Sequence, residues 1–341
     1  MKILLPVDSS IYSRSAIETL VNAEWLSASE ILLVTVVRPI ESLLAVSLDE
    51  KAIAKEQEII TEKSNWLMEI AESLKRALPA CRIDYRVKFG DIRETIIQTA
   101  IEEGFELVVM GSHGKGTIER LLIGSVAQCV LEHAPTAIMI VKRHGNMDNQ
   151  KLSRFEKILV PYDGSVYSGD TVSWLSRRVF SAKTKFHIVM AIPEFEEVEQ
   201  KEVSPNQCVL LDKQWHTIKE RSFEILENIA LKLGSIVGNE NVSIDAVPGD
   251  PQTAILKAAE RFGADLIACG SHGRSGLSRL LIGSVSMYLV HNARCPVLVL
   301  KRLSSSEPPS SDTNQKKTHH TSEDKARKRS ISESTPPFSM M

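Results

Sequence analysis

The sequence has little of what stabilises small secreted domains or holds metal ions. Its 341 residues include five cysteines, an odd number, and no two of them form a CxxC pair. A disulfide framework and a thiolate zinc site are therefore not expected, and a reduced cytosolic chain fits best. The nine histidines show no HExxH or other metal-ligand spacing. We expect apolar, buried cysteines at Cys81, Cys129, Cys208, Cys269 and Cys295.

Long apolar runs and a strong net charge are also missing. No stretch approaches the ~18 apolar residues of a membrane span, and the opening MKILLPVDSS is too short an apolar run for a signal peptide. The formal net charge of −2 gives no global attraction to nucleic acid or to an anionic membrane. We therefore expect a cytoplasmic protein with no nucleic-acid partner and no membrane partner.

Several enzyme motifs are absent as well. The sequence contains no GxxxxGK[ST] loop, no GxGxxG after a first strand and no GxSxG elbow. The Ser-Gly-Gly phosphate loop of adenylating α/β enzymes is replaced by DSS or DGS. Neither half offers an obvious paired general acid and base. These absences weaken the conventional enzyme readings, so we assign no catalytic residue and no metal ligand.

What the chain does contain is an internal repeat. Residues 2–13 (KILLPVDSSIYS) and 157–168 (KILVPYDGSVYS) are identical at eight of twelve positions. Residues 111–126 (GSHGKGTIERLLIGSV) and 270–285 (GSHGRSGLSRLLIGSV) are identical at eleven of sixteen. Segments this similar, in the same order and at nearly the same offset, indicate duplication of a whole domain.

Each repeat alternates short apolar strands with amphipathic helices. In the first repeat we expect strands at 3–7, 31–37, 83–87, 107–110 and 137–142, and helices at 10–26, 50–78, 91–103 and 125–133. In the second repeat the expected strands are 158–162, 186–192, 242–247, 266–269 and 297–301. This alternation predicts a parallel sheet that helices cover on both faces, with right-handed crossovers.

The repeats set the predicted domain boundaries at residues 1–142 and 157–302. The polar segment 143–156 (RHGNMDNQKLSRFE) is predicted to be a linker. Residues 303–341 are rich in serine, proline and charge, and are predicted to be disordered because they cannot repay the entropy of ordering. The basic cluster Lys325–Arg329 leaves a nucleic-acid or phosphorylation-linked tail open, although a solvated flexible tail is favoured.

Conspicuous residues fall at the carboxyl ends of predicted strands, where open parallel sheets bind ligands. Asp8 and Asp163 follow the first strand of their repeats, and Gly111 and Gly270 follow the fourth. If the first and fourth strands are neighbours, both segments line one crevice. Asp8 capping the first helix is an alternative that stays open.

The glycine spacing in this segment fits an anion site. Gly111 and Gly114 lack side chains, so their backbone can approach a polyanion closely. Gly124 and Ser125 follow nine residues later, at the start of a predicted helix whose amides and dipole favour phosphate. The second repeat keeps this spacing at Gly270, Gly273, Gly283 and Ser284.

The pattern of Gly, two residues, Gly, nine residues and Gly-Ser resembles the ATP-binding signature of the universal stress protein family. The openings KILLPVD and KILVPYD and the pairs Gly90-Asp91 and Gly249-Asp250 resemble that family too. The resemblance covers roughly residues 1–142 and 157–302. It implies an α/β fold of two tandem doubly wound, five-stranded parallel-sheet domains with strand order 3-2-1-4-5, packed as a pseudo-dimer through their last strands.

The resemblance also implies roles for matching residues. Asp8 and Asp163 would lie against the nucleoside of a bound ATP, and Thr35 and Met190 near its adenine. The signature residues that would hold or adjoin the ribose and phosphates are Gly111, His113, Gly114, Gly124, Ser125, Val126, Gly270, His272, Gly273, Gly283, Ser284 and Val285. The two histidines are better explained by hydrogen bonding or packing than as catalytic bases. To these we add two cations beside the loop, Lys115 and Arg274.

The favoured hypothesis is an ATP-binding stress-response or signalling protein. Mg²⁺ would arrive on the phosphates, and nucleotide occupancy would tune the conformation or the binding of an unidentified protein partner. A slow ATPase or nucleotidyl-transfer enzyme and a nucleotide-free scaffold are the alternatives, and a homodimer beyond the pseudo-dimer is left open. Differences between the repeats at Met110/Cys269, Ser9/Gly164 and Val7/Tyr162 make equal affinity of the two sites unexpected.

Overall fold

The computed structural model describes residues 1–26, 29–39, 50–114, 123–142, 155–194, 205–273 and 282–301. Met1–Leu303 form one compact unit. The predicted tail, Lys115 and Arg274 lie outside the described residues, as does the predicted linker apart from Phe155 and Glu156.

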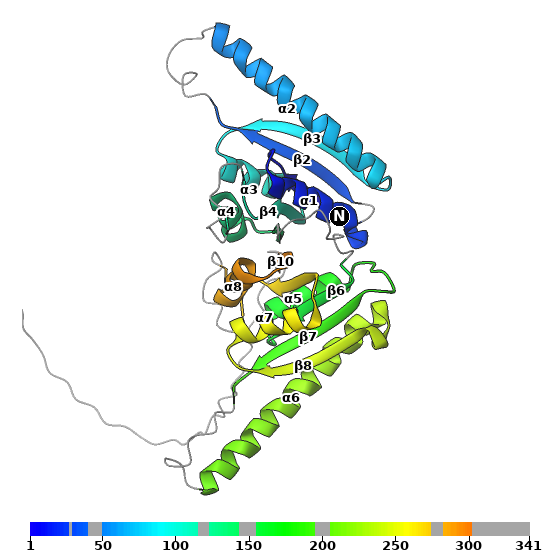
Figure 1. The fold of residues 1–341 in the computed structure, drawn as a ribbon, viewed down its shortest axis with the longest axis vertical. Helices are drawn as coiled ribbons and strands as arrows, with labels where there is room; N and C mark the ends of the chain where they lie inside the picture. The colour runs from blue at the N-terminus through cyan, green and yellow to red at the C-terminus, as the bar shows by residue number, and fades with distance from the viewer. Residues whose placement is uncertain are drawn as a thin grey trace, which may run out of the picture. The chain divides into compact units, whose positions relative to one another are not determined.

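The first repeat folds into five strands and four α-helices (Figure 1). The strands are β1 (Lys2–Pro6), β2 (Glu30–Val37), β3 (Arg82–Phe89), β4 (Leu107–Gly111) and β5 (Ala137–Val141). The helices are α1 (Ile11–Asn22), α2 (Glu50–Ala77), α3 (Ile92–Glu102) and α4 (Ser125–His133). The first helix is shorter than predicted, because the chain leaves the α-helix at Ala23 and continues as a 3₁₀ turn, η1 (Glu24–Leu26).

The second repeat has the same element order. Its strands are β6 (Lys157–Pro161), β7 (Lys185–Ile192), β8 (Val242–Pro248), β9 (Leu266–Gly270) and β10 (Val297–Leu300). Its helices are α5 (Val166–Leu175), α6 (Pro205–Val237), α7 (Pro251–Phe262) and α8 (Ser284–Asn292), with a short 3₁₀ turn, η3 (Asn239–Asn241), before β8. As α2 packs along β2 and β3, α6 packs along β7 and β8 (Figure 1).

The sheet topology confirms the predicted order 3-2-1-4-5. The ten strands run β3-β2-β1-β4-β5-β10-β9-β6-β7-β8, so each repeat contributes the same arrangement. Pairing is parallel within each repeat and antiparallel between β5 and β10, where Met139 lies opposite Leu298. An edge strand exposes unpaired N–H and C=O groups. The contact expected between the last strands is therefore confirmed, and it removes one edge from each half.

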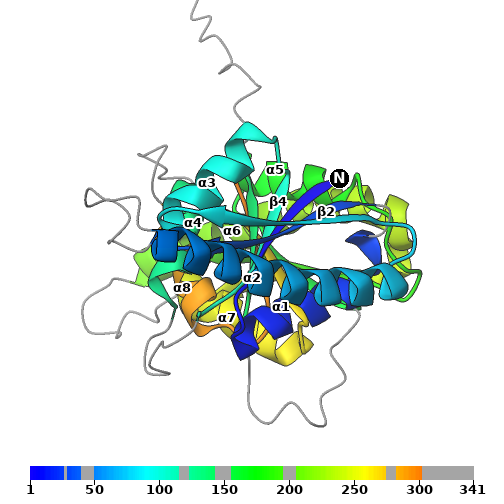
Figure 2. The ribbon, with the colours of Figure 1, turned by 90° about the horizontal axis from the view of Figure 1, so that it is seen from above.

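Helices cover both faces of the sheet (Figure 2). On one face, Ile3 of β1 packs in a core that includes Leu67 of α2. On the other, Leu4 packs with residues of α3 and α4 such as Ile96 and Leu131. Successive residues of a strand point to opposite faces, so a strand buried on both faces reads as a continuous apolar run.

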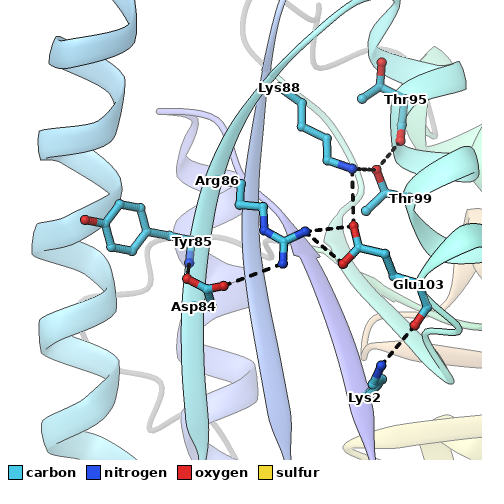
Figure 3. Close-up of polar contacts among 8 residues, drawn as sticks. All are labelled: Lys2, Asp84, Tyr85, Arg86, Lys88, Thr95, Thr99 and Glu103. Carbon is cyan, nitrogen blue, oxygen red and sulfur yellow. Dashed lines mark hydrogen bonds and ion pairs between the residues drawn. The ribbon is translucent and has the colours of Figure 1, made fainter.

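A polar network fixes α3 against the sheet (Figure 3). Glu103, just past the end of α3, accepts hydrogen bonds from Arg86 at 2.9 Å and from Lys88 at 3.3 Å. Lys88 also donates to Thr99 Oγ1 at 2.8 Å, and Lys2 of β1 donates to the Glu103 carbonyl at 3.2 Å. These contacts tie β1 and β3 to α3, whose first turns line the cavity described below.

An aromatic cluster joins the two repeats on the face of the sheet that α2 covers. Trp25, in η1 of the first repeat, is 5% exposed. Its ring lies 5.6 Å from that of Trp174 in α5, 6.0 Å from Phe180 and 6.2 Å from Phe155, measured between centroids. The repeats therefore share one continuous core in addition to the paired strands.

Two lysines cross the seam between β5 and β10 in a reciprocal way. Lys142, which follows β5, donates to the carbonyls of His291 and Ala293 at the end of α8. Lys301, which follows β10, donates to the carbonyl of Glu132 near the end of α4 at 2.8 Å. Burial lowers the pKa of each lysine to about 8. Each repeat thus supplies a cation to the C-terminal end of a helix in the other, where the helix dipole favours positive charge.

Candidate functional site

A cavity of about 540 Å³ opens at the carboxyl ends of β1, β2 and β4 in the first repeat. The N-terminal ends of α3 and α4 and one face of α2 complete its wall. The eight described residues predicted for a site in this repeat all line the cavity: Asp8, Thr35, Gly111, His113, Gly114, Gly124, Ser125 and Val126. The fold thus gathers residues that are more than 100 positions apart in the chain.

The Asp8 carboxylate is held in place by the turn that leads into α1. Its Oδ1 accepts hydrogen bonds from the Ser10 N–H at 3.0 Å and from the Ser13 hydroxyl at 2.7 Å. Ser10, and not Asp8, is the N-cap of α1. The other oxygen, Oδ2, faces Gly114, where an added Cβ would lie 2.9 Å from it. Gly114 therefore leaves room for this carboxylate at the cavity wall.

Gly111 has a packing role that the sequence did not indicate. A Cβ on Gly111 would lie 2.7 Å from the carbonyl carbon of Tyr12, closer than real Cβ contacts come. Gly270 meets Tyr167 in the same way, at 2.8 Å. Glycine at the end of β4 and β9 therefore lets the first helix of each repeat approach its strand.

The N-terminus of α4 faces the cavity. Gly124 is the N-cap and provides no side-chain hydrogen bond to the helix. Its own N–H donates to the Ser112 carbonyl at 2.8 Å, so this amide is already used within the protein. An anion at this end of α4 would instead meet the N–H groups of Ser125 and Val126. They lie in the first turn, where an α-helix leaves N–H groups without intrahelical acceptors.

The His113 ring contacts Ser112 and Tyr12 near the cavity. Its Nδ1 lies 3.0 Å from the Ser112 hydroxyl, and its ring centroid lies 4.9 Å from that of Tyr12. His272 repeats both contacts with Ser271 and Tyr167, at 3.0 Å and 5.0 Å. These contacts fit the prediction that the two histidines act in hydrogen bonding and packing.

The second repeat has the same local framework. Asp163 Oδ1 accepts from the Ser165 N–H at 3.0 Å, and Oδ2 would lie 2.9 Å from a Cβ on Gly273. The Gly283 N–H donates to the Ser271 carbonyl at 2.7 Å, and Gly283 caps α8 as Gly124 caps α4. Ser284 and Val285 form the first turn of α8, and Met190 is buried in β7.

Sequence reasoning missed part of the cavity wall. Arg38 follows β2, and Lys63 and Trp66 come from α2. In the sequence, all three are far from both signature segments. The other missed residues include Val34, Val36, Val37, Ile92 and Ile96. The helical spacing of Lys63 and Trp66 places them on one face of α2, but nothing in the sequence indicates which strand end that face meets.

The cysteine prediction is only partly right. Among the described side chains, Cys269 is buried, whereas Cys81, Cys129 and Cys295 are partly exposed. Burial raises the pKa of the Cys269 thiol to about 12, so it stays protonated near neutral pH. Cys208 lies where side chains are not described.

The described residues contain no group of three or more His, Cys, Asp or Glu side chains placed to hold a metal ion. Within the same ranges, every helix is too short or too polar to cross a membrane.

Comparison with known proteins matches both halves of the chain to one family. The universal stress protein family matches residues 1–142 and again residues 154–301. Universal stress protein MJ0531 of Methanocaldococcus jannaschii is 30% identical over 154 residues, covering 43% of this chain and 83% of that protein. Universal stress protein Rv2005c of Mycobacterium tuberculosis is 27% identical over 239 residues, covering 68% of this chain and 76% of that protein.

The fold has a solved counterpart. The crystal structure of a universal stress protein from Archaeoglobus fulgidus aligns with a TM-score of 0.59 at 22% identity, covering 88% of this chain and 98% of that one. At this identity the likeness concerns the fold, and it extends over both repeats. Together with the two family matches, it shows that the chain belongs to the universal stress protein family and carries two of the family's domains in tandem.

Proposed function

We propose that this protein binds ATP in the cavity of its first repeat, with Mg²⁺ carried on the phosphates, and that occupancy tunes its conformation or its binding to a protein partner in the cytoplasm. One observation carries the proposal: the eight described residues that the sequence predicts for this site all line one cavity. Its volume, about 540 Å³, lies in the range of small-molecule pockets, roughly 300–1,000 Å³.

The two ends of the cavity suit the two ends of a nucleotide. The first amides of α4, at Ser125 and Val126, and the positive end of the helix dipole favour phosphate oxygens. The apolar side chains Val36 and Val37, at the end of β2, line the cavity and suit a purine base. Asp8 stands between these parts, where a carboxylate can accept hydrogen bonds from ribose hydroxyls.

A link to the second repeat supports the regulatory part of the proposal. The N-terminal end of α4 lines the cavity, and its C-terminal end receives Lys301 from the second repeat. A ligand shifts a conformational equilibrium only by binding one state better than another. Since α4 touches both the cavity and the seam, nucleotide that moves α4 would alter the packing between the repeats.

Isothermal titration of nucleotide-free protein with Mg-ATP tests the proposal, with GTP and NAD as comparison ligands. We expect one or two ATP per chain, and weaker binding in Gly124→Val, because a Cβ at Gly124 would lie 3.3 Å from the His113 Cα and a larger side chain would enter the site. Gly283→Val is the matched variant in the second repeat. If millimolar ATP produced no heat of binding and no thermal shift, the proposal would be refuted.

A further inference from the structure

The wall of the cavity opposite α4 combines an aromatic ring with two cations. Trp66 and Lys63 lie one helical turn apart on α2, and Arg38 follows the end of β2. Trp66 is partly buried against the core, and the Lys63 side chain is 32% exposed and pairs with Glu62 at 2.9 Å. None of these residues belongs to the glycine signature.

Strand register gives the counterpart of Arg38 in the second repeat. Pro6 pairs with Val34, and the corresponding Pro161 pairs with Val189. Counting four residues along each strand aligns Arg38 with Pro193. The position therefore carries a cation in the first repeat and an apolar residue without an N–H in the second.

Core packing gives the counterparts on the long helices. Leu67 and Leu74 of α2 are buried in the same core as Leu226 and Leu233 of α6, with the same spacing of seven residues. Strand register supports this offset, because Ile31 pairs with Ile83 and the corresponding Phe186 pairs with Val242. The counterparts are thus Ser222 for Lys63 and Ile225 for Trp66.

The second repeat uses this region differently. Ser222 is 6% exposed and donates its hydroxyl to the Ile218 carbonyl at 2.8 Å, inside its own helix. Trp215, from an earlier turn of α6, donates its indole N–H to the Pro193 carbonyl at 3.1 Å. An aromatic side chain of the protein therefore bonds to the backbone at the position that corresponds to Arg38.

We propose that Trp66, with Arg38 and Lys63, recognises the base of the nucleotide, and that the first repeat is in consequence the high-affinity site of the chain. This inference rests on the proposed function. With phosphates at α4, the base reaches the α2 side of the cavity, where the indole offers a stacking surface. Arg38 and Lys63 can donate hydrogen bonds to ring nitrogens of a purine. A purine stacks over a larger area than a pyrimidine, so ATP is preferred to CTP.

Titration of the full-length protein with ATP and with CTP tests the inference. Base stacking on an aromatic residue is worth about 1–3 kcal/mol, so Trp66→Ala should weaken ATP binding by about 5- to 150-fold. It should also reduce the preference for ATP over CTP, which a general loss of stability would not do. Ile225→Ala, the matched variant in the second repeat, should change ATP affinity by less than about twofold, since the change there removes no stacking partner.

A spectroscopic readout covers the case in which Trp66→Ala fails to fold. In a Trp215→Phe background, ATP should quench tryptophan emission, and the further change Trp66→Phe should abolish the quenching, because the remaining Trp25 and Trp174 lie in the shared core. Unchanged ATP affinity in Trp66→Ala, or quenching that persists in Trp66→Phe/Trp215→Phe, would overturn the inference while leaving ATP binding intact. If the wild type binds no ATP at all, the proposed function fails and this inference fails with it.

Discussion

Replacing Gly111 with alanine should destabilise the protein even when no nucleotide is present. The added Cβ would lie 2.7 Å from both the carbonyl carbon and the Cβ of Tyr12, and 2.8 Å from the carbonyl oxygen. The obstacle is mainly the backbone of α1, so rotation of a side chain cannot relieve it. Either α1 or β4 must shift, in a region where both are packed against the core.

The expected magnitude follows from the cost of overpacking. Forcing one extra carbon into a packed core costs about 1–3 kcal/mol. For a domain of about 150 residues, each kcal/mol lowers the thermal midpoint by about 2–4 °C. Gly111→Ala should therefore lower the midpoint of the nucleotide-free protein by about 2–12 °C. Gly270→Ala should have a similar effect, since its Cβ would meet Tyr167 at 2.8 Å.

Differential scanning calorimetry of the full-length chain measures this effect. Gly169→Ala is a matched control, because Gly169 lies within α5 and a Cβ there would meet nothing within 4 Å. That change should leave the midpoint unchanged or raise it slightly, since glycine inside a helix costs roughly 0.5–1 kcal/mol relative to alanine. If Gly111→Ala kept the wild-type midpoint and lost only ATP binding, the packing role assigned to Gly111 would be wrong.

Three further predictions concern the seam and the surface. Trp25→Ala should cost about 3–5 kcal/mol in urea unfolding, because it empties the centre of the aromatic cluster shared by the repeats; a loss below about 1 kcal/mol would show that the cluster contributes little. Burial lowers the pKa of Lys142 and Lys301 to about 8 in the folded protein, whereas the unfolded chain keeps a pKa of about 10.4. The unfolded state therefore binds more protons between these values, so the wild type should gain stability relative to Lys142→Met/Lys301→Met as the pH rises through this window. Urea midpoints at about pH 7.5 and about pH 9.5 measure the change, and a constant difference would contradict it. Glu103→Gln should cost less than about 1 kcal/mol, since its partners Arg86 and Lys88 are 45% and 28% exposed to solvent. The cost should shrink at high salt, which thermal unfolding in low-salt and high-salt buffer would show.

Local sequence signals determined most of the fold. Apolar runs bounded by polar residues mark the strands, because a strand buried on both faces has apolar side chains at successive positions. Aspartate is a preferred N-cap residue, and the Asp91 side chain accepts hydrogen bonds from the Arg93 and Glu94 N–H groups at the start of α3. The repeat itself then fixed the number of domains, and the resemblance to a family supplied the strand order and the pairing of the last strands.

The candidate site was predictable only where its residues carry a local pattern. Asp8, Gly114 and Ser125 stand out because their spacing recurs 155 to 159 residues later. Lys63 and Trp66 carry no such mark, because their place at the cavity depends on how α2 docks on β2 and β3. An amphipathic pattern specifies that a helix has a buried face, but it does not specify the neighbour against which that face packs.

The sequence by itself therefore determined the duplication, the order of the elements and the residues of the glycine signature. Only the tertiary structure decided that Gly111 accommodates Tyr12, that the Gly124 amide is already bonded to Ser112, and that α2 supplies a wall of the cavity. The physical reason is range: strands, caps and turns follow from interactions between near neighbours in the chain. Close packing and cavity walls arise from surfaces that meet only after the chain has folded.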